Sequence, residues 1–273
     1  MKVAAIQMVS GLSCEANLEA ASLLILQAVE QGAELVVLPE YFCILGAVDT
    51  DKLAVKEDLG SGPIQSMLAQ AAAKHRIWIV GGTLPLSVPD DNDKVYNSTL
   101  VYNPQGELVA RYDKIHLFKF KKGKEQYDES KTLVAGNKPA CFDLISHSGQ
   151  SWRVGLSICY DLRFPELYRS LVDMGVDVIL VPSAFTQTTG AAHWEILLRA
   201  RAIENQVWLV AAAQGGEHEN LRKTWGQSMI VNPWGQVMSE LATGSGCAVF
   251  DIDKVELDRV RLELPALEHR KLD

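Results

Sequence analysis

Short apolar runs alternate with longer amphipathic stretches along the first part of the chain. The apolar runs are short enough to be buried strands and lie at residues 3–8, 35–38 and 77–80. Stretches with helical spacing separate them, at residues 15–31 and 63–75. Residues 98–102 and 108–112 flank the turn Asn103-Pro104-Gln105-Gly106, which is typical of a β-hairpin. The order therefore predicts βαβ units followed by a hairpin.

The second part of the chain repeats this plan. Strands are expected at residues 154–158, 178–181 and 207–212, and helices at residues 165–174 and 191–205. A second hairpin turns at Asn232-Pro233-Trp234-Gly235, at a distance from its preceding strand similar to that of the first hairpin. The repetition predicts two halves related by an internal pseudo-two-fold repeat.

Both halves must bury the two faces of their sheets. Two mixed sheets that stack face to face, with helices outside, achieve this, so we predict an α/β fold with a four-layer α-β-β-α sandwich. No linker rich in Gly, Ser or Pro interrupts the pattern, and we expect one domain over residues 1–273. A last helix is expected at 253–263. The charged tail at 264–273 has no core pattern, which leaves it free or packed at a dimer interface.

Composition and charge narrow the functional classes. Apolar residues make up 48% of the 273 residues and charged residues 22%, a balance typical of a globular protein with a large core. The formal charge of −8 argues against nucleic acid as a partner, because phosphate binding needs clustered Lys and Arg. No membrane span or secretory signal is evident, so we expect a cytoplasmic protein without a membrane partner.

Three chemically useful side chains follow apolar strands. Glu40 follows the run Leu35-Val36-Val37-Leu38, Lys114 follows the second strand of the first hairpin, and Cys159 follows residues 154–158. Cys159 is one of five scattered cysteines without a C-x-x-C pair, so its position and not its residue type singles it out. Strand ends are where α/β sheets hold reactive groups.

Together these groups suit the opening of an amide or a nitrile. Glu40 would take the thiol proton as the Cys159 sulfur attacks. Lys114 and the backbone N–H of Tyr160 would stabilise the oxyanion of the tetrahedral intermediate. Loss of ammonia or an amine leaves a thioester, which Glu40 would help water to hydrolyse.

The motifs Leu38-Pro39-Glu40, Asp113-Lys114-Ile115-His116-Leu117 and Ile158-Cys159-Tyr160-Asp161 resemble those of the nitrilase superfamily of carbon–nitrogen hydrolases. The resemblance spans nearly the whole chain. It implies the α-β-β-α fold, a Glu-Lys-Cys triad, no metal or organic cofactor, and a homodimer or higher homo-oligomer. It also implies a second glutamate after the lysine, for which Glu129 is the candidate and Asp128 the neighbouring alternative.

The second half is most similar to Nit-type amidases, through Cys159-Tyr160-Asp161-Leu162-Arg163-Phe164-Pro165 and Thr189-Gly190-Ala191-Ala192-His193. This resemblance implies hydrolysis of a primary amide on a small anionic ω-amido 2-oxo acid, with ammonia released and deaminated glutathione favoured. The alternative substrates are α-ketoglutaramate and α-ketosuccinamate, or an aliphatic amide, nitrile or N-carbamoyl compound.

A 2-oxo acid needs a cation in the site. Arg163 lies four residues after the nucleophile, where its planar guanidinium would bind the substrate carboxylate. The alternative is a structural ion pair of Arg163 with Glu166 or Asp161. The resemblance implies that Phe185 and Thr189 line the same pocket. The basic stretch 119–124 is interpreted as a solvated face, with attraction of an anionic substrate as the alternative.

Other readings of the same residues remain open. His193-Trp194-Glu195 resembles part of a metal site, but it lacks a second ligand pair, which favours helix packing. A Cys–His hydrolase with His116 or His193 as base leaves Glu40 and Lys114 unexplained. A dehydrogenase would need a nucleotide motif, and no G-x-G-x-x-G follows the first strand. A non-catalytic binding protein is the remaining rival.

Overall fold

A computed structural model describes residues 1–123 and 125–272 of the chain. The first sheet runs in the order β18-β1-β2-β3-β5-β4, and β6 and β9 pair with β5. Its strands are β1 (Lys2–Gln7), β2 (Leu35–Val37), β3 (Trp78–Val80), β4 (Leu84–Val88), β5 (Asp91–Tyr102), β6 (Leu108–Asp113), β9 (Leu133–Val134) and β18 (Gly246–Asp251).

The second sheet runs in the order β10-β11-β12-β13-β16-β17. Its strands are β10 (Ala140–Ile145), β11 (Ser151–Leu156), β12 (Val178–Leu180), β13 (Trp208–Ala211), β16 (Met229–Val231) and β17 (Val237–Glu240). In each sheet three parallel strands are flanked by antiparallel neighbours, β1-β2-β3 in the first and β11-β12-β13 in the second. The pairings confirm two mixed sheets.

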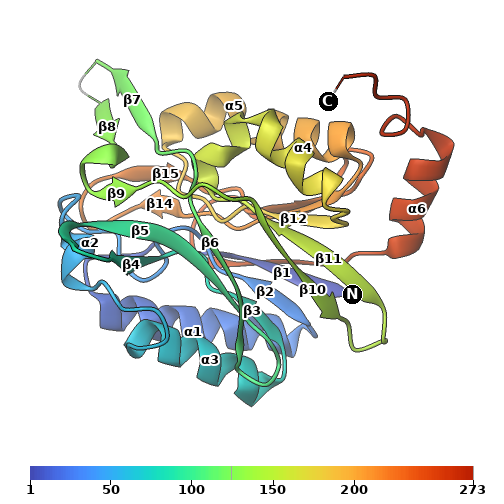
Figure 1. The fold of residues 1–273 in the computed structure, drawn as a ribbon. Helices are drawn as coiled ribbons and strands as arrows, with labels where there is room; N and C mark the ends of the chain where they lie inside the picture. The colour runs from blue at the N-terminus through green and yellow to red at the C-terminus, as the bar shows by residue number, and fades with distance from the viewer. Residues whose placement is uncertain (124, 273) are drawn as a thin grey trace.

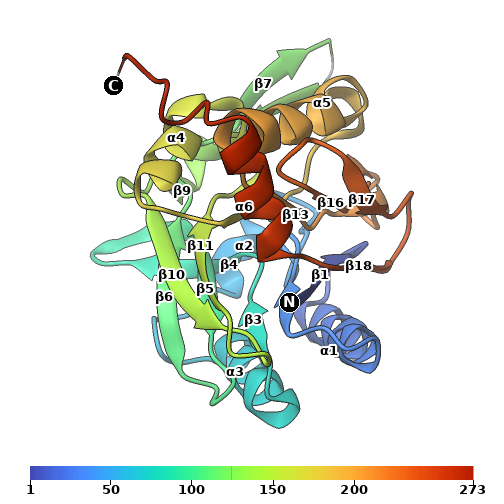
Figure 2. The ribbon, with the colours of Figure 1, turned by 90° about the vertical axis from the view of Figure 1, so that its right-hand side faces the viewer.

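Helices cover the outer face of each sheet, as both views show (Figures 1 and 2). The helices α1 (Cys14–Glu30) and α3 (Pro63–His75) lie against the first sheet, and α4 (Pro165–Asp173) and α5 (Gln187–Asn205) lie against the second. A short helix, α2 (Asp51–Ala54), precedes α3, and α6 (Lys254–Glu263) closes one side of the sandwich (Figure 2). The four-layer prediction is confirmed.

The side chains of β1 point alternately to the two faces of the first sheet and so connect its neighbouring layers. Val3 and Ala5 pack into the core between the sheets, whereas Ala4 and Ile6 pack against the helices α1 and α3. Successive residues of a strand point to opposite faces, so a strand buried on both faces is apolar throughout. This is why the parallel strands read as unbroken apolar runs.

The structure differs from the sequence prediction at several elements. Helix α5 begins at Gln187, four residues before the predicted start, because the Thr186 side chain caps it by accepting from the Thr189 N–H. Residues 119–122 form strand β7 (Lys119–Lys122), which pairs with β8 (Glu125–Asp128); Lys124, the last residue of the basic stretch, lies outside the described residues. A small hairpin, β14 (Gly215–Glu217) and β15 (Lys223–Trp225), was also not predicted.

The C-terminal tail folds back on its own chain: the Gln206 side chain donates to Leu264 O, and Arg270 pairs with Asp173 of α4. Within residues 1–123 and 125–272, no helix is both long enough and apolar enough to span a membrane.

Candidate active site

Three strand ends bring Glu40, Lys114 and Cys159 together. Glu40 lies three residues after β2, Lys114 directly after β6, and Cys159 three residues after β11. The Lys114 Nζ atom lies 2.8 Å from Glu40 Oε1. All three residues are buried, with exposed fractions of 1%, 1% and 7%. Buried charges need partners of opposite charge, and here the Lys114 ammonium and the Glu40 carboxylate are partners of each other.

Cys159 sits at a strained turn. Its φ of 47° lies in the left-handed region, which residues with a Cβ rarely adopt. A 3-10 helix, Cys159–Arg163, starts at this residue, and the Cys159 N–H donates to Pro182 O at 2.9 Å. The turn lifts the thiol out of the sheet and leaves the N–H of Tyr160 in the first helical turn, where N–H groups lack intrahelical partners.

Asp161 ties this turn to the segment that carries the lysine. Its carboxylate accepts from the Ile158 N–H at 2.9 Å, the Tyr112 hydroxyl at 2.7 Å and the His116 N–H at 3.0 Å. A buried carboxylate with several donors is rigid, because each lost bond would leave a charge poorly solvated. Asp161 thereby fixes the Lys114 segment relative to Cys159.

Glu40 is held from two sides. Asn97, in β5, donates its Nδ2–H to Glu40 Oε1 at 2.9 Å, and the Lys114 N–H donates to Asn97 O at 3.0 Å. Gln214, just after β13, donates its Nε2–H to the Glu40 main-chain oxygen at 3.1 Å. These bonds leave the carboxylate few alternative orientations.

Glu129 is the second carboxylate on the lysine. It lies at the start of a 3-10 helix, Glu129–Lys131, and its Oε2 is 2.8 Å from Lys114 Nζ. The Tyr41 hydroxyl donates to Glu129 Oε1 at 2.8 Å, and the Phe118 N–H donates to Oε2 at 2.7 Å. Asp128 points elsewhere and pairs with Lys119 at 3.1 Å.

Burial and charge set the protonation states. Burial raises the pKa of the Cys159 thiol well above that of an ordinary cysteine, the Glu40 carboxylate raises it further, and Lys114 opposes both. Burial alone would lower the pKa of Lys114, but Glu129 and Glu40 outweigh it, and the pKa lies above its usual value. Burial likewise opposes ionisation of Glu129, yet Lys114 holds its pKa below the usual value. The resting site thus pairs a neutral thiol with an ammonium group.

A narrow cavity of about 20 Å³ opens over Cys159. Glu40, Tyr160, Arg163, Phe185 and Thr189 contribute to its lining. The Arg163 guanidinium stacks on Phe185 at 5.2 Å and lies 3.2 Å from the His193 Nδ1 atom. Within the described part of the chain Arg163 has no ion pair with Glu166 or Asp161, so its charge is available in the cavity.

The two histidines considered as bases lie apart from the thiol cavity. His116 Nδ1 is 2.7 Å from Asp161 Oδ1, and the ring stacks on Phe164 at 3.7 Å. His193 contacts Arg163, while its neighbour Trp194 is buried and donates to Gln227 O at 2.7 Å. Across residues 1–123 and 125–272, no cluster of three or more His, Cys, Asp or Glu side chains could hold a metal.

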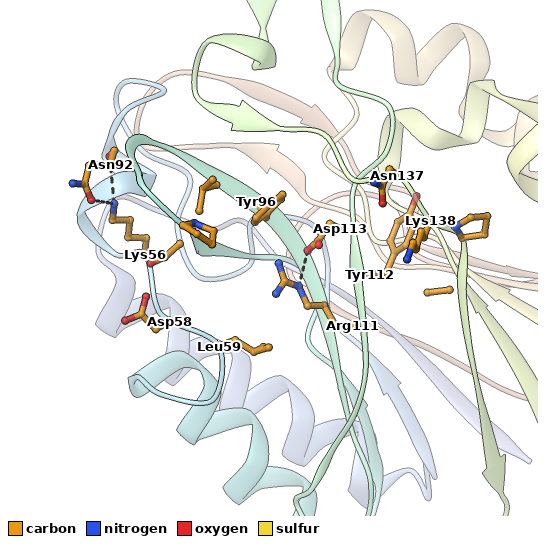
Figure 3. Close-up of a pocket in the computed structure, with 15 residues that line it drawn as sticks. Lys56, Asp58, Leu59, Asn92, Tyr96, Arg111, Tyr112, Asp113, Asn137 and Lys138 are labelled. Atoms are coloured by element: carbon orange, nitrogen blue, oxygen red, sulfur yellow. Dashed lines mark hydrogen bonds and ion pairs between the residues drawn. The ribbon is translucent and has the colours of Figure 1, made fainter.

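A much larger hollow, of about 1110 Å³, lies elsewhere on the surface, beside β4 and β6 (Figure 3). Some of its charged side chains already have partners: Arg111 binds Asp113 at 2.9 Å, and Lys56 binds the Asn92 side chain at 3.2 Å. None of Glu40, Lys114 and Cys159 lines it. The size of a hollow is therefore a poor guide to the chemistry of this molecule.

Several contributors to the site escaped sequence reasoning: Tyr41, Asn97, Asp161, Gln214 and Arg222. Tyr41 directly follows Glu40, and its position in a strand-end motif is a usable signal. Asn97 and Gln214 act only through strand pairing, which no local pattern reveals.

An α-β-β-α sandwich that holds a thiol, a carboxylate and an ammonium group where its strands end defines an enzyme of the nitrilase class. The sequence model for "Carbon-nitrogen hydrolase" matches residues 2–262. The chain belongs to the carbon–nitrogen hydrolase family.

Named relatives agree with this assignment. The chain is 42% identical over 268 residues to a deaminated glutathione amidase of Synechocystis sp. (strain PCC 6803 / GT-S), with 98% of this chain and 97% of the relative covered. It is 37% identical over 259 residues to an omega-amidase of Homo sapiens, with coverage of 94% and 90%. The crystal structure of Saccharomyces cerevisiae Nit3, a nitrilase superfamily member, aligns with a TM-score of 0.88 at 30% identity and covers 100% of this chain and 97% of that one.

Proposed function

We propose that the protein hydrolyses the amide of a small anionic ω-amido 2-oxo acid, with deaminated glutathione as the favoured substrate. The observation that carries the proposal is the contact of buried Glu40 and Lys114 beside Cys159, in a cavity that is also lined by Arg163, a cation without an acidic partner among the described residues. The names of the relatives support the same substrate class. α-Ketoglutaramate is the second candidate, because an omega-amidase is among those relatives.

In the proposed reaction, Cys159 attacks the amide carbon while its proton passes to Glu40. A base is needed because the raised pKa of Cys159 leaves the resting thiol protonated. The carbonyl electron pair moves to oxygen, where Lys114 and the Tyr160 N–H stabilise the charge. The C–N bond then breaks, and Glu40 returns the proton to the leaving nitrogen.

The second half of the reaction releases the acid. Water attacks the thioester carbon and gives a proton to Glu40, and the C–S bond breaks. The sulfur regains a proton from Glu40, so the thiol and the carboxylate are restored. Glu129 keeps Lys114 oriented through both halves by its ion pair at 2.8 Å.

The leaving group distinguishes the two candidate substrates. α-Ketoglutaramate carries a primary amide and releases ammonia. Deaminated glutathione carries the same 2-oxoglutaryl group on a secondary amide and releases cysteinylglycine. The sequence expectation of a primary amide and of ammonia release is therefore wrong for this substrate and holds only for α-ketoglutaramate and the other primary amides. Both yield 2-oxoglutarate, and both place a 2-oxo acid carboxylate where Arg163 would bind it.

The test is a substrate panel with two readouts, 2-oxoglutarate and ammonia. Deaminated glutathione, α-ketoglutaramate, an aliphatic amide, a nitrile and an N-carbamoyl amino acid are compared at equal concentration. We expect the highest kcat/KM for deaminated glutathione, with 2-oxoglutarate formed without ammonia. Zero turnover across the panel would overturn the proposal in favour of a binding protein, and turnover of the aliphatic amide alone would remove the role of Arg163.

We also propose that residues 1–273 act as one hydrolase domain in the cytoplasm, as a homodimer with the tail 264–273 near the interface. Five cysteines that form no disulfide support a reducing compartment. Exposed Ile196 and Ile203 on α5 support a contact surface. Light scattering of the purified protein, with and without residues 264–273, measures the oligomeric state directly; a monomer would contradict the proposal.

A further inference from the structure

A second cation lines the thiol cavity. Arg222 directly precedes β15 and lines the cavity over Cys159. It also lines an adjoining cavity that shares Tyr41, Phe118 and Glu129 with the first. Arg222 therefore stands at the junction of the two cavities, where a substrate longer than a primary amide would pass.

The guanidinium of Arg222 has no polar partner within residues 1–123 and 125–272. Its Nε is buried without a hydrogen bond to any described residue, and the guanidinium lies over the Tyr127 ring, 4.7 Å from the centroid. Buried polar groups are normally hydrogen-bonded, so an unpaired guanidinium beside a reactive thiol indicates a site for an anion.

The main chain around Arg222 is nevertheless well fixed. The Arg222 N–H donates to Asn220 Oδ1 at 2.9 Å, and the His218 N–H donates to Arg222 O at 2.9 Å. Asn220 in turn donates to Gly46 O at 2.6 Å, which anchors the turn to the wall of the second cavity. A charge on a fixed backbone is preorganised and loses little entropy on binding.

The second cavity is lined by another cation and by three acids. Lys52 lies over the Tyr41 ring at 5.2 Å, and its only hydrogen bond within the described residues goes to Thr132 at 3.4 Å. Of the three acids, Glu129 is paired with Lys114, Asp128 is paired with Lys119, and Asp49 is exposed. The positive charges of Lys52 and Arg222 thus remain available to a ligand, whereas two of the three acids are already paired.

Two cations in the site match two carboxylates in the substrate. Arg163 suffices for a 2-oxo acid whose leaving group is ammonia. We propose that Arg222, assisted by Lys52, binds the terminal carboxylate of a peptide leaving group, and so selects the 2-oxoacyl peptide over the primary amide. The inference rests on the proposed function, because it assigns the other end of the same substrate.

The experiment compares two substrates that share one product. For the unmodified protein, Arg222→Gln and Arg222→Lys, 2-oxoglutarate formation gives kcat/KM for deaminated glutathione and for α-ketoglutaramate. We expect Arg222→Gln to lower the ratio of the two values about 30-fold, mainly through a higher KM for deaminated glutathione, and Arg222→Lys to restore part of it. Arg163→Gln is the matched control: it should lower both values and leave their ratio within about 3-fold.

A modified substrate tests the same contact without a protein variant. Replacement of the glycine carboxylate of deaminated glutathione by a carboxamide should lower kcat/KM of the unmodified protein about 30-fold. The same replacement should change kcat/KM of Arg222→Gln only slightly, because the variant has already lost the contact with that carboxylate. Equal losses in both proteins, or an unchanged substrate ratio in Arg222→Gln, would overturn the role of Arg222 and leave the proposed function standing. If the unmodified protein hydrolyses neither substrate, the proposed function and this inference both fail.

Discussion

The two halves of the sandwich share a scaffold and differ at their strand ends. Residues 38–42 read Leu-Pro-Glu-Tyr-Phe, and residues 181–185 read Val-Pro-Ser-Ala-Phe. Both segments follow the central parallel strand of their sheet, and both open with equivalent backbone bonds: the Leu38 N–H donates to Val80 O, and the Val181 N–H to Val210 O, each at 3.0 Å. The same turn presents a carboxylate in one half and the hydroxyl of Ser183 in the other.

Strand register extends the comparison to the nucleophile. Ala5 pairs with Val37 in the first half, and Leu156 pairs with Leu180 in the second. The counterpart of Cys159 is therefore Met8, a buried core residue. The two halves thus share their backbone geometry but not the side chains of the proposed site. In our proposal the first half provides the acid and the lysine, and the second provides the thiol and Arg163.

The largest effect on turnover is expected for substitution of Glu40. Glu40→Gln keeps the shape of the side chain but cannot accept the thiol proton, so kcat should fall about 1000-fold. The check is 2-oxoglutarate formation, with circular dichroism to establish that the variant is folded. Activity within about 10-fold of the unmodified protein would show that another group is the base.

Lys114→Met is expected to lower kcat about 100-fold or more, because an oxyanion donor is lost. It also leaves the buried carboxylate of Glu40 and the partly buried carboxylate of Glu129 without their shared cation, and loss of one partner from a buried ion pair typically costs about 3–5 kcal/mol of stability. Urea unfolding measures that cost. A variant as stable as the unmodified protein would contradict the central position of Lys114 in the charge network.

The pH dependence of thiol alkylation separates the two charged neighbours of Cys159. Iodoacetamide reacts with the thiolate, so its rate rises with pH through the pKa of Cys159. Glu40 raises that pKa and Lys114 lowers it. The profile of Glu40→Gln should therefore move to lower pH, and that of Lys114→Met to higher pH. Shifts of the same sign in both variants would refute this electrostatic account.

The smallest effect is expected at the counterpart of Glu40. Ser183→Ala removes one hydroxyl, whose hydrogen bond to Val181 O is 3.2 Å long. Turnover should stay within about 2-fold, and stability should fall by about 1 kcal/mol. A loss of activity comparable to that of Glu40→Gln would mean that the second turn also takes part in the chemistry, and the comparison of the halves would fail.

The residues of the proposed chemistry were visible in the sequence because they follow strand-like segments. Glu40 and Cys159 follow mainly apolar runs, Lys114 follows the second strand of a hairpin, and the repeat of strands and hairpins indicated the layers. The hairpin β7–β8 was not visible, since its residues are partly or fully exposed on both faces and show no alternation.

The supporting residues depend on contacts between distant segments. Asn97 lies within a strand and reaches Glu40 only because β5 leads back beside β3. Arg222 lies in a turn after Leu221. The φ of Leu221 is 65°, and no local sequence pattern predicts this left-handed conformation. Such positions follow from tertiary packing, which single-sequence periodicity does not encode.

The central claim is that Cys159 carries the acyl group during turnover. Acid quench of the working enzyme with α-ketoglutaramate, followed by denaturing mass spectrometry and peptide mapping, detects that thioester directly. We predict a 2-oxoglutaryl adduct, sensitive to hydroxylamine, on the peptide that contains Cys159, and neither adduct nor turnover in Cys159→Ala. Sustained 2-oxoglutarate formation by Cys159→Ala, or an adduct on a different residue, would contradict the account.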